Sequence, residues 1–330
     1  MDAPQYDSFM VKALTSVVSL PSELPLLPEA LGTKFVGKVA LGRFNLLMPV
    51  LPAGPLLPAL PLLDPLESPF TQAHGGPRAW GHTESSMPAS GVEPVIGRVS
   101  AVVVEVDAEI SPNELPDFAE TFGQEFNQWY GIAISWIELW NDLNLTNLQE
   151  SYPGTTGTIG APDASGIASG WSPVERMYVT SAARAISEGT LALAFEKATA
   201  DEHPPAEWVL YLQGAKTFDD RLAVIEAATA AEVALTGAIH QRLAQLTAEA
   251  RELIVENANG LYGMVKLLQK IDAKKDGPTL DKVGKQLAKP RNKAVHAGWQ
   301  PTNHEVREAF VIAGVLLEEY SPLPARTAGV

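Results

Sequence analysis

Residues 218–246 read FDDRLAVIEAATAAEVALTGAIHQRLAQL, and this stretch decides the fold of the C-terminal part of the chain. Apolar residues recur in it at steps of three, four or seven, which is the spacing that aligns side chains on one face of an α-helix. The residues on that face are Leu222, Ile225, Ala228, Leu235, Ile239, Leu243 and Leu246. The stretch therefore predicts one long amphipathic helix, with Glu232 inside its apolar stripe.

The chain on either side of this stretch predicts further helices. The expected segments are 205–214, 247–257, 260–271 and 279–297, with a break between the last two at Asp276-Gly277-Pro278. Pro290 adds a risk of a break inside the last segment, because proline lacks the N–H that a helix interior needs. These segments together predict a small helical bundle whose penultimate helix is rich in lysine.

The junction between the last two helices carries clear stop and start signals. Gly298 is placed as a C-terminal cap, since glycine adopts the left-handed conformation that ends many helices. Thr302 and Glu305 have the spacing of a capping box, which opens the final helix. That helix is expected to bury one stripe made of Val306, Phe310, Ala313, Leu317 and Tyr320.

Residues 1–95 have a different composition, with 14 of the 26 prolines of the chain. Two runs in this region, Phe9–Leu20 and Lys34–Leu47, have the composition of strands and are separated by prolines. Residues 74–94 are rich in Gly, Ser and Pro, and we expect an exposed loop there.

Residues 96–204 predict a mixed α/β region. It begins with the β-branched run Arg98–Asp107, which predicts a strand. Ser111 and Glu114 have capping-box spacing and open a helix, whereas residues 150–172 predict a Gly/Ser/Thr-rich loop. The apolar stripe of that helix is expected to be core and consists of Phe118, Phe122, Phe126, Trp129, Ala133, Trp136 and Trp140.

The fold class predicted for the whole chain is therefore α+β, with a β-containing N-terminal domain followed by an all-α bundle of four to five helices. The predicted regions are 1–95, 96–204 and 205–330, and the first two can belong to one domain.

The charge of the protein is unevenly divided along the sequence. Its 330 residues include 24 Lys and Arg against 39 Asp and Glu, so the formal net charge is −15. Residues 1–204 contain 9 basic and 24 acidic residues, whereas 205–330 contain 15 of each. Residues 266–293 contain nine basic and three acidic residues. The overall charge argues against a polyanionic partner, but this local excess of positive charge does not.

Other features of the composition narrow the class of protein. The absence of cysteine excludes disulfides, thiolate metal sites and cysteine nucleophiles. The first residues, MDAPQYDSFM, lack the basic start of a signal peptide, so we expect a cytoplasmic protein. Residues 46–63 are uncharged, but prolines at every third position argue against a membrane span. This proline strip is either an extended arm packed on its own domain or a docking site for a protein partner.

Two possible binding motifs, for a nucleotide phosphate and for a metal ion, are not supported by the residues around them. Residues 32–38 match a phosphate-binding loop as far as Lys38, but Val39 replaces the required Ser or Thr. His74 and His82 are isolated in the predicted loop, so neither a metal nor a cofactor is expected.

The hexapeptide Arg291-Asn292-Lys293-Ala294-Val295-His296 resembles the R-x4-6-H signature of the HEPN superfamily (higher eukaryote and prokaryote nucleotide-binding domains). It lies in the penultimate helix, and the stretch from Phe218 to Leu235 resembles the first long helix of that family. The resemblance covers roughly residues 205–320. It implies a helical bundle that forms a homodimer, and in many members a metal-independent endoribonuclease with a composite site at the dimer interface. The implied catalytic residues are Arg291 and His296, supported by Asn292.

The chemistry of these residue types suits RNA cleavage. Cleavage without a metal needs a base for the 2′-hydroxyl, an acid for the leaving oxygen and a cation for the phosphorane. His296 can serve as base or acid because histidine titrates near neutrality. Arg291 keeps its charge and can grip phosphate with two donors. Lys285, Lys289 and Lys293, four residues apart, are expected to contact the RNA backbone.

The geometry of one helix limits this site. Arg291 and His296 are five residues apart, which corresponds to about 140° around an ideal helix. One straight helix therefore does not bring both to a single phosphate, unless Pro290 distorts it. A twofold dimer would place two Arg–His sets in one cleft, and we favour that arrangement.

Three alternatives remain open at the level of sequence. Some HEPN members are not enzymes, so the bundle can be a non-catalytic RNA-binding or dimerisation module. Glu232 is either a partner of Arg291 that supports the site or a residue at the edge of the apolar stripe. The family association also suggests a toxin or antiviral defence effector, whose residues 1–204 recognise a protein partner or trigger.

Overall fold

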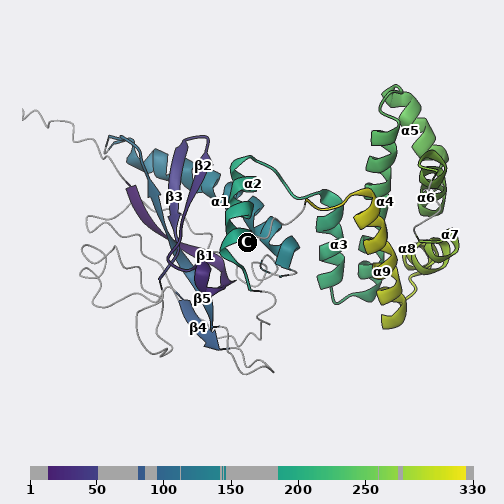
Figure 1. Cartoon of the computed structure of the whole chain (residues 1–330), viewed down its shortest axis with the longest axis horizontal. Coiled ribbons are helices and arrows are strands. Elements are labelled where there is room, and N and C mark those ends of the chain that lie inside the picture. Colours follow the sequence, from purple (N-terminus) through teal and green to yellow (C-terminus); the bar gives the residue numbers. More distant parts are fainter. Residues whose placement is uncertain are drawn as a thin grey trace, which may run out of the picture. The chain divides into compact units, whose positions relative to one another are not determined.

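The computed structural model describes residues 14–50, 81–85, 95–111, 113–141, 143, 145, 185–258, 260–273 and 278–324. These residues form two compact units, one up to His203 and one from Pro204 onward (Figure 1). The first contains a sheet with helices, and the second is helical, so the protein belongs to the α+β class.

An antiparallel sheet forms the centre of the first unit. Its strands are β1 (Leu14–Leu26), β2 (Lys34–Val39), β3 (Gly42–Leu47), β4 (Gly81–Ser85) and β5 (Val95–Val106). They pair in the order β1-β5-β3-β2, and β4 also pairs with β5. The predicted strand Arg98–Asp107 is confirmed as most of β5, whose residues from Ile96 to Val104 are all buried.

Helices α1 (Leu115–Asn141) and α2 (Glu188–Thr199) pack on this sheet through aromatic side chains. Phe44 of β3 meets the rings of Phe122, Phe126 and Trp129 edge-on, with centroids 5.7, 5.4 and 4.9 Å away. Gly37 makes room for this ring, because a Cβ atom there would lie 2.2 Å from Phe44 Cζ. The aromatic stripe predicted for 118–140 is therefore confirmed as core from Phe122 to Trp136, whereas Phe118 and Trp140 at its ends are only partly buried.

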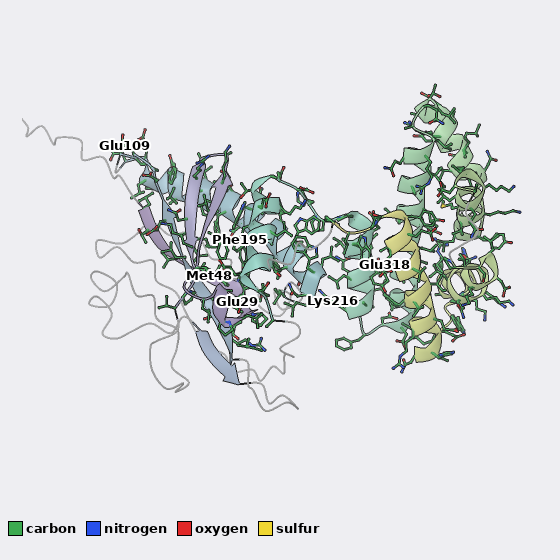
Figure 2. All side chains as sticks on the ribbon, viewed as in Figure 1. Glu29, Met48, Glu109, Phe195, Lys216 and Glu318 are labelled. Carbon is green, nitrogen blue, oxygen red and sulfur yellow. The ribbon has the colours of Figure 1, made fainter. Side chains whose placement is uncertain are left out.

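Helix α2 packs against the same core. Phe195 of α2, labelled in Figure 2, lies 5.0 Å from the ring of Phe35 on β2 and 5.1 Å from that of Trp129 on α1. These three rings connect the edge strand to both helices.

The structure changes several details of the predicted strands. The run Lys34–Leu47 is two strands joined by a tight turn, and β1 continues past Pro21 to Leu26 with a register shift between Ser19 and Leu24. The expectation of a loop throughout 74–94 is wrong at β4, which pairs with β5. Most of the proline strip and the predicted loop 150–172 lie outside the described residues.

The second unit is built around helix α4 (Asp220–Arg242). The other helices are α3 (Ala206–Lys216), α5 (Ala248–Asn257), α6 (Gly260–Ile271), α7 (Leu280–Lys282), the π-helical segment η5 (Val283–Ala288), α8 (Lys289–Ala297) and α9 (Asn303–Tyr320). Helix α4 contacts α3, α5, α6, η5, α8 and α9. The long helix, its neighbours and the final helix were all predicted from the sequence.

The buried face of α4 differs from the predicted stripe. Leu222 is 43% exposed and Leu246, just beyond the helix, is 38% exposed, whereas all seven alanines of α4 are buried. The buried alanines are Ala223, Ala227, Ala228, Ala230, Ala231, Ala234 and Ala238. Neighbours on several sides bury more than one stripe, and small side chains let their backbones approach closely.

Helix α4 is also the one described helix that is long and apolar enough to cross a membrane, and 56% of the apolar window is buried in the protein. This is a weak and ambiguous sign, because the core helix of a water-soluble bundle has the same length and composition.

Candidate functional site

The helix that carries the Arg–His motif changes its winding before Pro290. In a regular α-helix the ring of Pro290 would clash with the carbonyl of Gln286. Here η5 precedes it, and the N–H of Lys289 donates to the carbonyl of Gly284, five residues back. The chain therefore continues from Thr279 to Ala297 without the break that we considered at Pro290, because the wider π turn accommodates the proline.

The two ends of this segment behave as the sequence predicts. Gly298 adopts φ 60° and ends α8 in the left-handed conformation. Thr302 and Glu305 form a complete capping box at the start of α9.

One side of α8 packs against the bundle and the other is exposed. Pro290 and Ala294 are buried, and the carbonyl of Ala294 accepts a hydrogen bond of 2.7 Å from Nε of Arg221 on α4. The exposed polar side chains are Lys289, Asn292, Lys293 and His296, and the last three lie three, four and seven residues after Lys289. That spacing places all four on a single face, which we call the α8 polar face.

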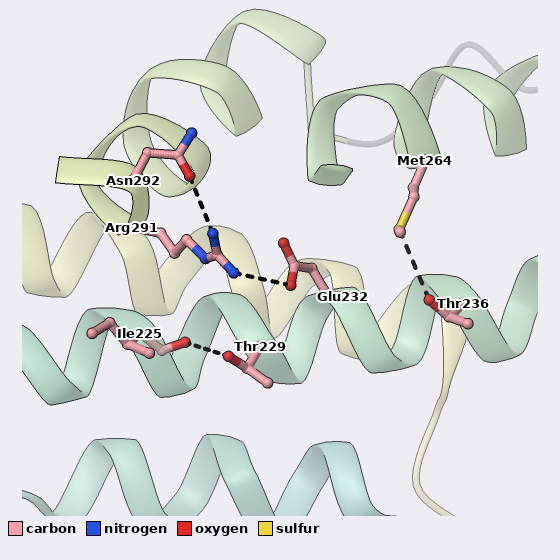
Figure 3. A network of polar contacts seen from close by, with 7 residues as sticks. All are labelled: Ile225, Thr229, Glu232, Thr236, Met264, Arg291 and Asn292. Atoms are coloured by element: carbon pink, nitrogen blue, oxygen red, sulfur yellow. Dashed lines mark hydrogen bonds and ion pairs between the residues drawn. The ribbon is translucent and has the colours of Figure 1, made fainter. Parts of the chain in front are cut away.

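Arg291 lies at the boundary between these two sides. Its Nη2 is 3.7 Å from Oε2 of Glu232 on α4, and its Nη1 donates to Oδ1 of Asn292 at 3.3 Å (Figure 3). The side chains of Arg291 and Glu232 are 29% and 28% exposed, and within the described part of the chain the buried Nε of Arg291 has no hydrogen-bond partner. The predicted pairing of Glu232 with Arg291 is thus present, while its support of a catalytic site stays a prediction.

A single chain does not bring Arg291 and His296 together. Arg291 contacts α4 through Glu232, whereas His296 belongs to the α8 polar face. This divergence agrees with the angle of about 140° expected for a spacing of five residues. Of the three predicted catalytic residues, Asn292 and His296 therefore lie on the α8 polar face and Arg291 lies at its boundary with α4.

The three predicted RNA-contacting lysines have different surroundings. Lys285 is 72% exposed and its Nζ lies 2.9 Å from Oδ2 of Asp281. Lys293 Nζ lies 4.8 Å from the ring centroid of Trp299, a cation–π distance. Lys289 is exposed on the α8 polar face.

Sequence reasoning did not single out Arg221 or Trp299. Arg221 lies two residues after the N-cap residue of α4, Asp219, and nothing local connects it to a carbonyl 73 residues away. Trp299 follows the C-cap glycine, a position where a hydrophobic residue often packs back on its helix, and this signal could have identified it.

Within the part of the chain that the structure describes, no group of three or more His, Cys, Asp or Glu residues is placed to hold a metal ion.

Comparisons with known proteins return no match: no family model, no curated protein and no solved structure resembles this chain significantly.

Proposed function

We propose that the helical unit is a metal-independent endoribonuclease of HEPN type that acts as a cytoplasmic homodimer. The observation that carries this proposal is the α8 polar face, where His296 lies exposed beside Asn292, Lys289 and Lys293. A histidine that only served packing would be buried or satisfied inside the bundle. Here it is accessible to a substrate, on a helix fixed to α4 by Pro290, Ala294 and Arg221.

The proposed chemistry assigns a role to each residue. His296 removes the proton of the 2′-hydroxyl or returns one to the leaving 5′-oxygen. Arg291 stabilises the charge of the phosphorane, and Glu232 and Asn292 orient its guanidinium. The lysines of the α8 polar face bind phosphates.

A second copy of the chain completes the site in this proposal. Since Arg291 and His296 diverge on one helix, a twofold axis beside α8 brings the Arg291 of one protomer toward the His296 of the other. The family association further suggests a toxin or antiviral defence effector, with a trigger recognised by residues 1–204.

The decisive experiment is a cleavage assay on structured RNAs with EDTA present. We expect the full-length protein to cut RNA, and Arg291→Ala and His296→Ala each to reduce the rate by at least about 100-fold, the usual scale for a catalytic acid, base or charge-stabilising group. Arg307→Ala and His304→Ala on α9 are matched controls, because both residues are exposed in the same unit. An inert wild-type protein, or variants that cut normally, would refute the nuclease.

Mixing the two inactive variants tests the composite site. A heterodimer of Arg291→Ala with His296→Ala retains one intact site if arginine and histidine come from different protomers. We expect about a quarter of the wild-type activity after subunit exchange, since half of the randomly paired dimers are mixed and each keeps one of two sites. No recovery, or a monomer in solution at micromolar concentration, would contradict the shared site.

One observation favours a second candidate function. The guanidinium of Arg291 is already occupied by Glu232 and Asn292, which suits a structural role in a non-catalytic RNA-binding or dimerisation module. Such a protein would bind RNA or dimerise while no RNA is cut, and Arg291→Ala would lower its stability rather than an activity.

A further inference from the structure

Helix α6 holds a large aromatic side chain, Tyr262, at the protein surface. The helix buries Leu261, Val265 and Leu268 in the bundle core. Tyr262 and Lys266 are one helical turn apart and are both exposed, and the exposed fraction of Tyr262 is 45%. The ring of Tyr262 is therefore accessible beside a lysine on the same ridge of the helix.

The ring of Tyr262 lies against the π-helical segment η5. A Cβ atom at Gly284 would lie 3.6 Å from Cδ2 of Tyr262, so the ring rests beside a residue that has no side chain. Lys285 follows Gly284 directly and is 72% exposed. The ring thus rests beside the backbone of η5, one helical turn from Lys266 on its own helix and next to the residue that precedes Lys285 on the other.

The surroundings of Tyr262 carry an excess of positive charge. The described residues from Gly260 to Gly298 contain seven basic side chains: Lys266, Lys270, Lys282, Lys285, Lys289, Arg291 and Lys293. They contain two acidic residues, Asp272 and Asp281. Asp272 is paired with Arg242 at 2.5 Å and Asp281 with Lys285 at 2.9 Å.

We propose that Tyr262, Lys266, Lys285 and Lys289 form a binding platform for single-stranded RNA. One base stacks on Tyr262, and the phosphates follow the lysines toward His296. Stacking on an aromatic ring beside a positively charged surface is the usual physical basis of single-strand binding, and it requires bases that are not paired. The path from Lys285 to His296 spans eleven residues, or about 16 Å of helix.

This inference rests on the proposed function in one respect: it takes the bound strand to be the RNA that is cut at His296. The binding itself does not need cleavage. A single-stranded DNA of the same sequence lacks the 2′-hydroxyl, cannot be cut by this chemistry, and still offers bases and phosphates. It is therefore a non-cleavable probe for the platform.

Binding of a fluorescein-labelled single-stranded DNA to the full chain, measured by fluorescence anisotropy in EDTA, tests the platform. We expect Tyr262→Ala to weaken binding about tenfold, because the variant loses the stacking of one base on an aromatic ring. Tyr262→Phe keeps the ring and should bind within about twofold of the wild type. Leu253→Ala on α5, where the side chain is 59% exposed, is the control for loss of an exposed apolar group.

The salt dependence of the affinity distinguishes the contribution of base stacking from that of the lysine charges. Lys266→Gln and Lys285→Gln should each reduce the slope of log affinity against log salt by about 0.7, whereas Tyr262→Ala should leave the slope unchanged. Circular dichroism melting of each variant shows that the fold is retained.

Different results would overturn the proposed binding platform and the proposed nuclease. Wild-type affinity in Tyr262→Ala, or binding to anionic lipid vesicles but not to single strands, overturns the platform even if Arg291 and His296 are required for cleavage. Loss of binding in Tyr262→Ala with rescue by Tyr262→Phe supports the platform even if no RNA is cut, and then only the nuclease proposal falls.

Discussion

The guanidinium of Arg291 both packs between two helices and is the charge assigned to the proposed site. It is a cation held between α8 and α4, less than one third exposed, with Glu232 as its counter-ion and Asn292 as a hydrogen-bond partner. Its buried Nε has no partner among the described residues, so in this part of the chain the guanidinium makes its contacts through its two terminal nitrogens. This arrangement fixes the position of a charge at the edge of the α8 polar face.

Removing the carboxylate should therefore destabilise the helical unit. We expect Glu232→Gln to lower the free energy of unfolding by about 1 kcal/mol, more than an exposed pair contributes and less than a fully buried one. Urea denaturation followed by circular dichroism measures the change.

Glu318→Gln on α9 is the matched control, because Glu318 is exposed and its loss should change stability by less than about 0.5 kcal/mol. A double-mutant cycle with Arg291→Gln isolates the pair. A coupling energy near zero would show that the pair at 3.7 Å contributes nothing to stability.

At the scale of elements, the ends of α8 and α9 are defined by local signals. The left-handed Gly298 ends the first, and the capping box of Thr302 and Glu305 begins the second. Hydrogen bonds from the backbone N–H and the hydroxyl of Thr302 to Glu305 lower the pKa of this carboxyl below its ordinary value. The ionised form is thus favoured in the folded state.

The capping box should make the stability of α9 depend on pH. A carboxyl whose pKa is lowered by folding contributes stability above its unfolded pKa of about 4.5, and this contribution is lost as the pH falls through the folded pKa. We expect Thr302→Ala to cost about 1 kcal/mol in the free energy of unfolding at pH 7, and less near pH 3. Urea denaturation at the two pH values measures the difference.

Thr279→Ala provides the comparison for this experiment. Thr279 caps α7 by accepting a hydrogen bond from the N–H of Lys282, and among the described residues no carboxylate is bonded to this cap. The loss of unfolding free energy caused by Thr279→Ala should be the same at both pH values. If both variants showed the same pH dependence, Glu305 would not be the source of that dependence.

At the scale of the whole molecule, the two compact units divide the charge between them. Residues 1–204 carry the entire net charge of −15, and residues 205–330 are neutral. The helical unit has its own buried core around α4. The acidic region should therefore oppose nucleic-acid binding by the helical unit through long-range repulsion.

A chain shortened to residues 205–330 should bind RNA several-fold more tightly than the full chain at low salt. The difference should shrink as the ionic strength rises, because salt screens charges beyond about 10 Å at 0.1 M. Anisotropy titrations at two salt concentrations measure it, after circular dichroism has shown the shortened chain to be folded. If residues 205–330 bound RNA as tightly as the full chain, or less tightly, the acidic region would not repel RNA.

The sequence by itself determined the features that depend on neighbours within a few residues. Helical periodicity located α4 and α9, glycine and threonine set helix ends, and a β-branched run located β5, since each signal acts within about one helical turn or one strand. The spacing in the Arg–His motif also predicted that Arg291 and His296 diverge on one helix.

Only the tertiary structure decided which distant residues meet. The pair of Arg291 with Glu232, the bond from Arg221 to Ala294, and Tyr262 against Gly284 all join different helices. The broad burial of α4 likewise depends on neighbours on several sides. These features follow from how the helices pack, because close packing fixes side chains that no local pattern along the chain relates to one another.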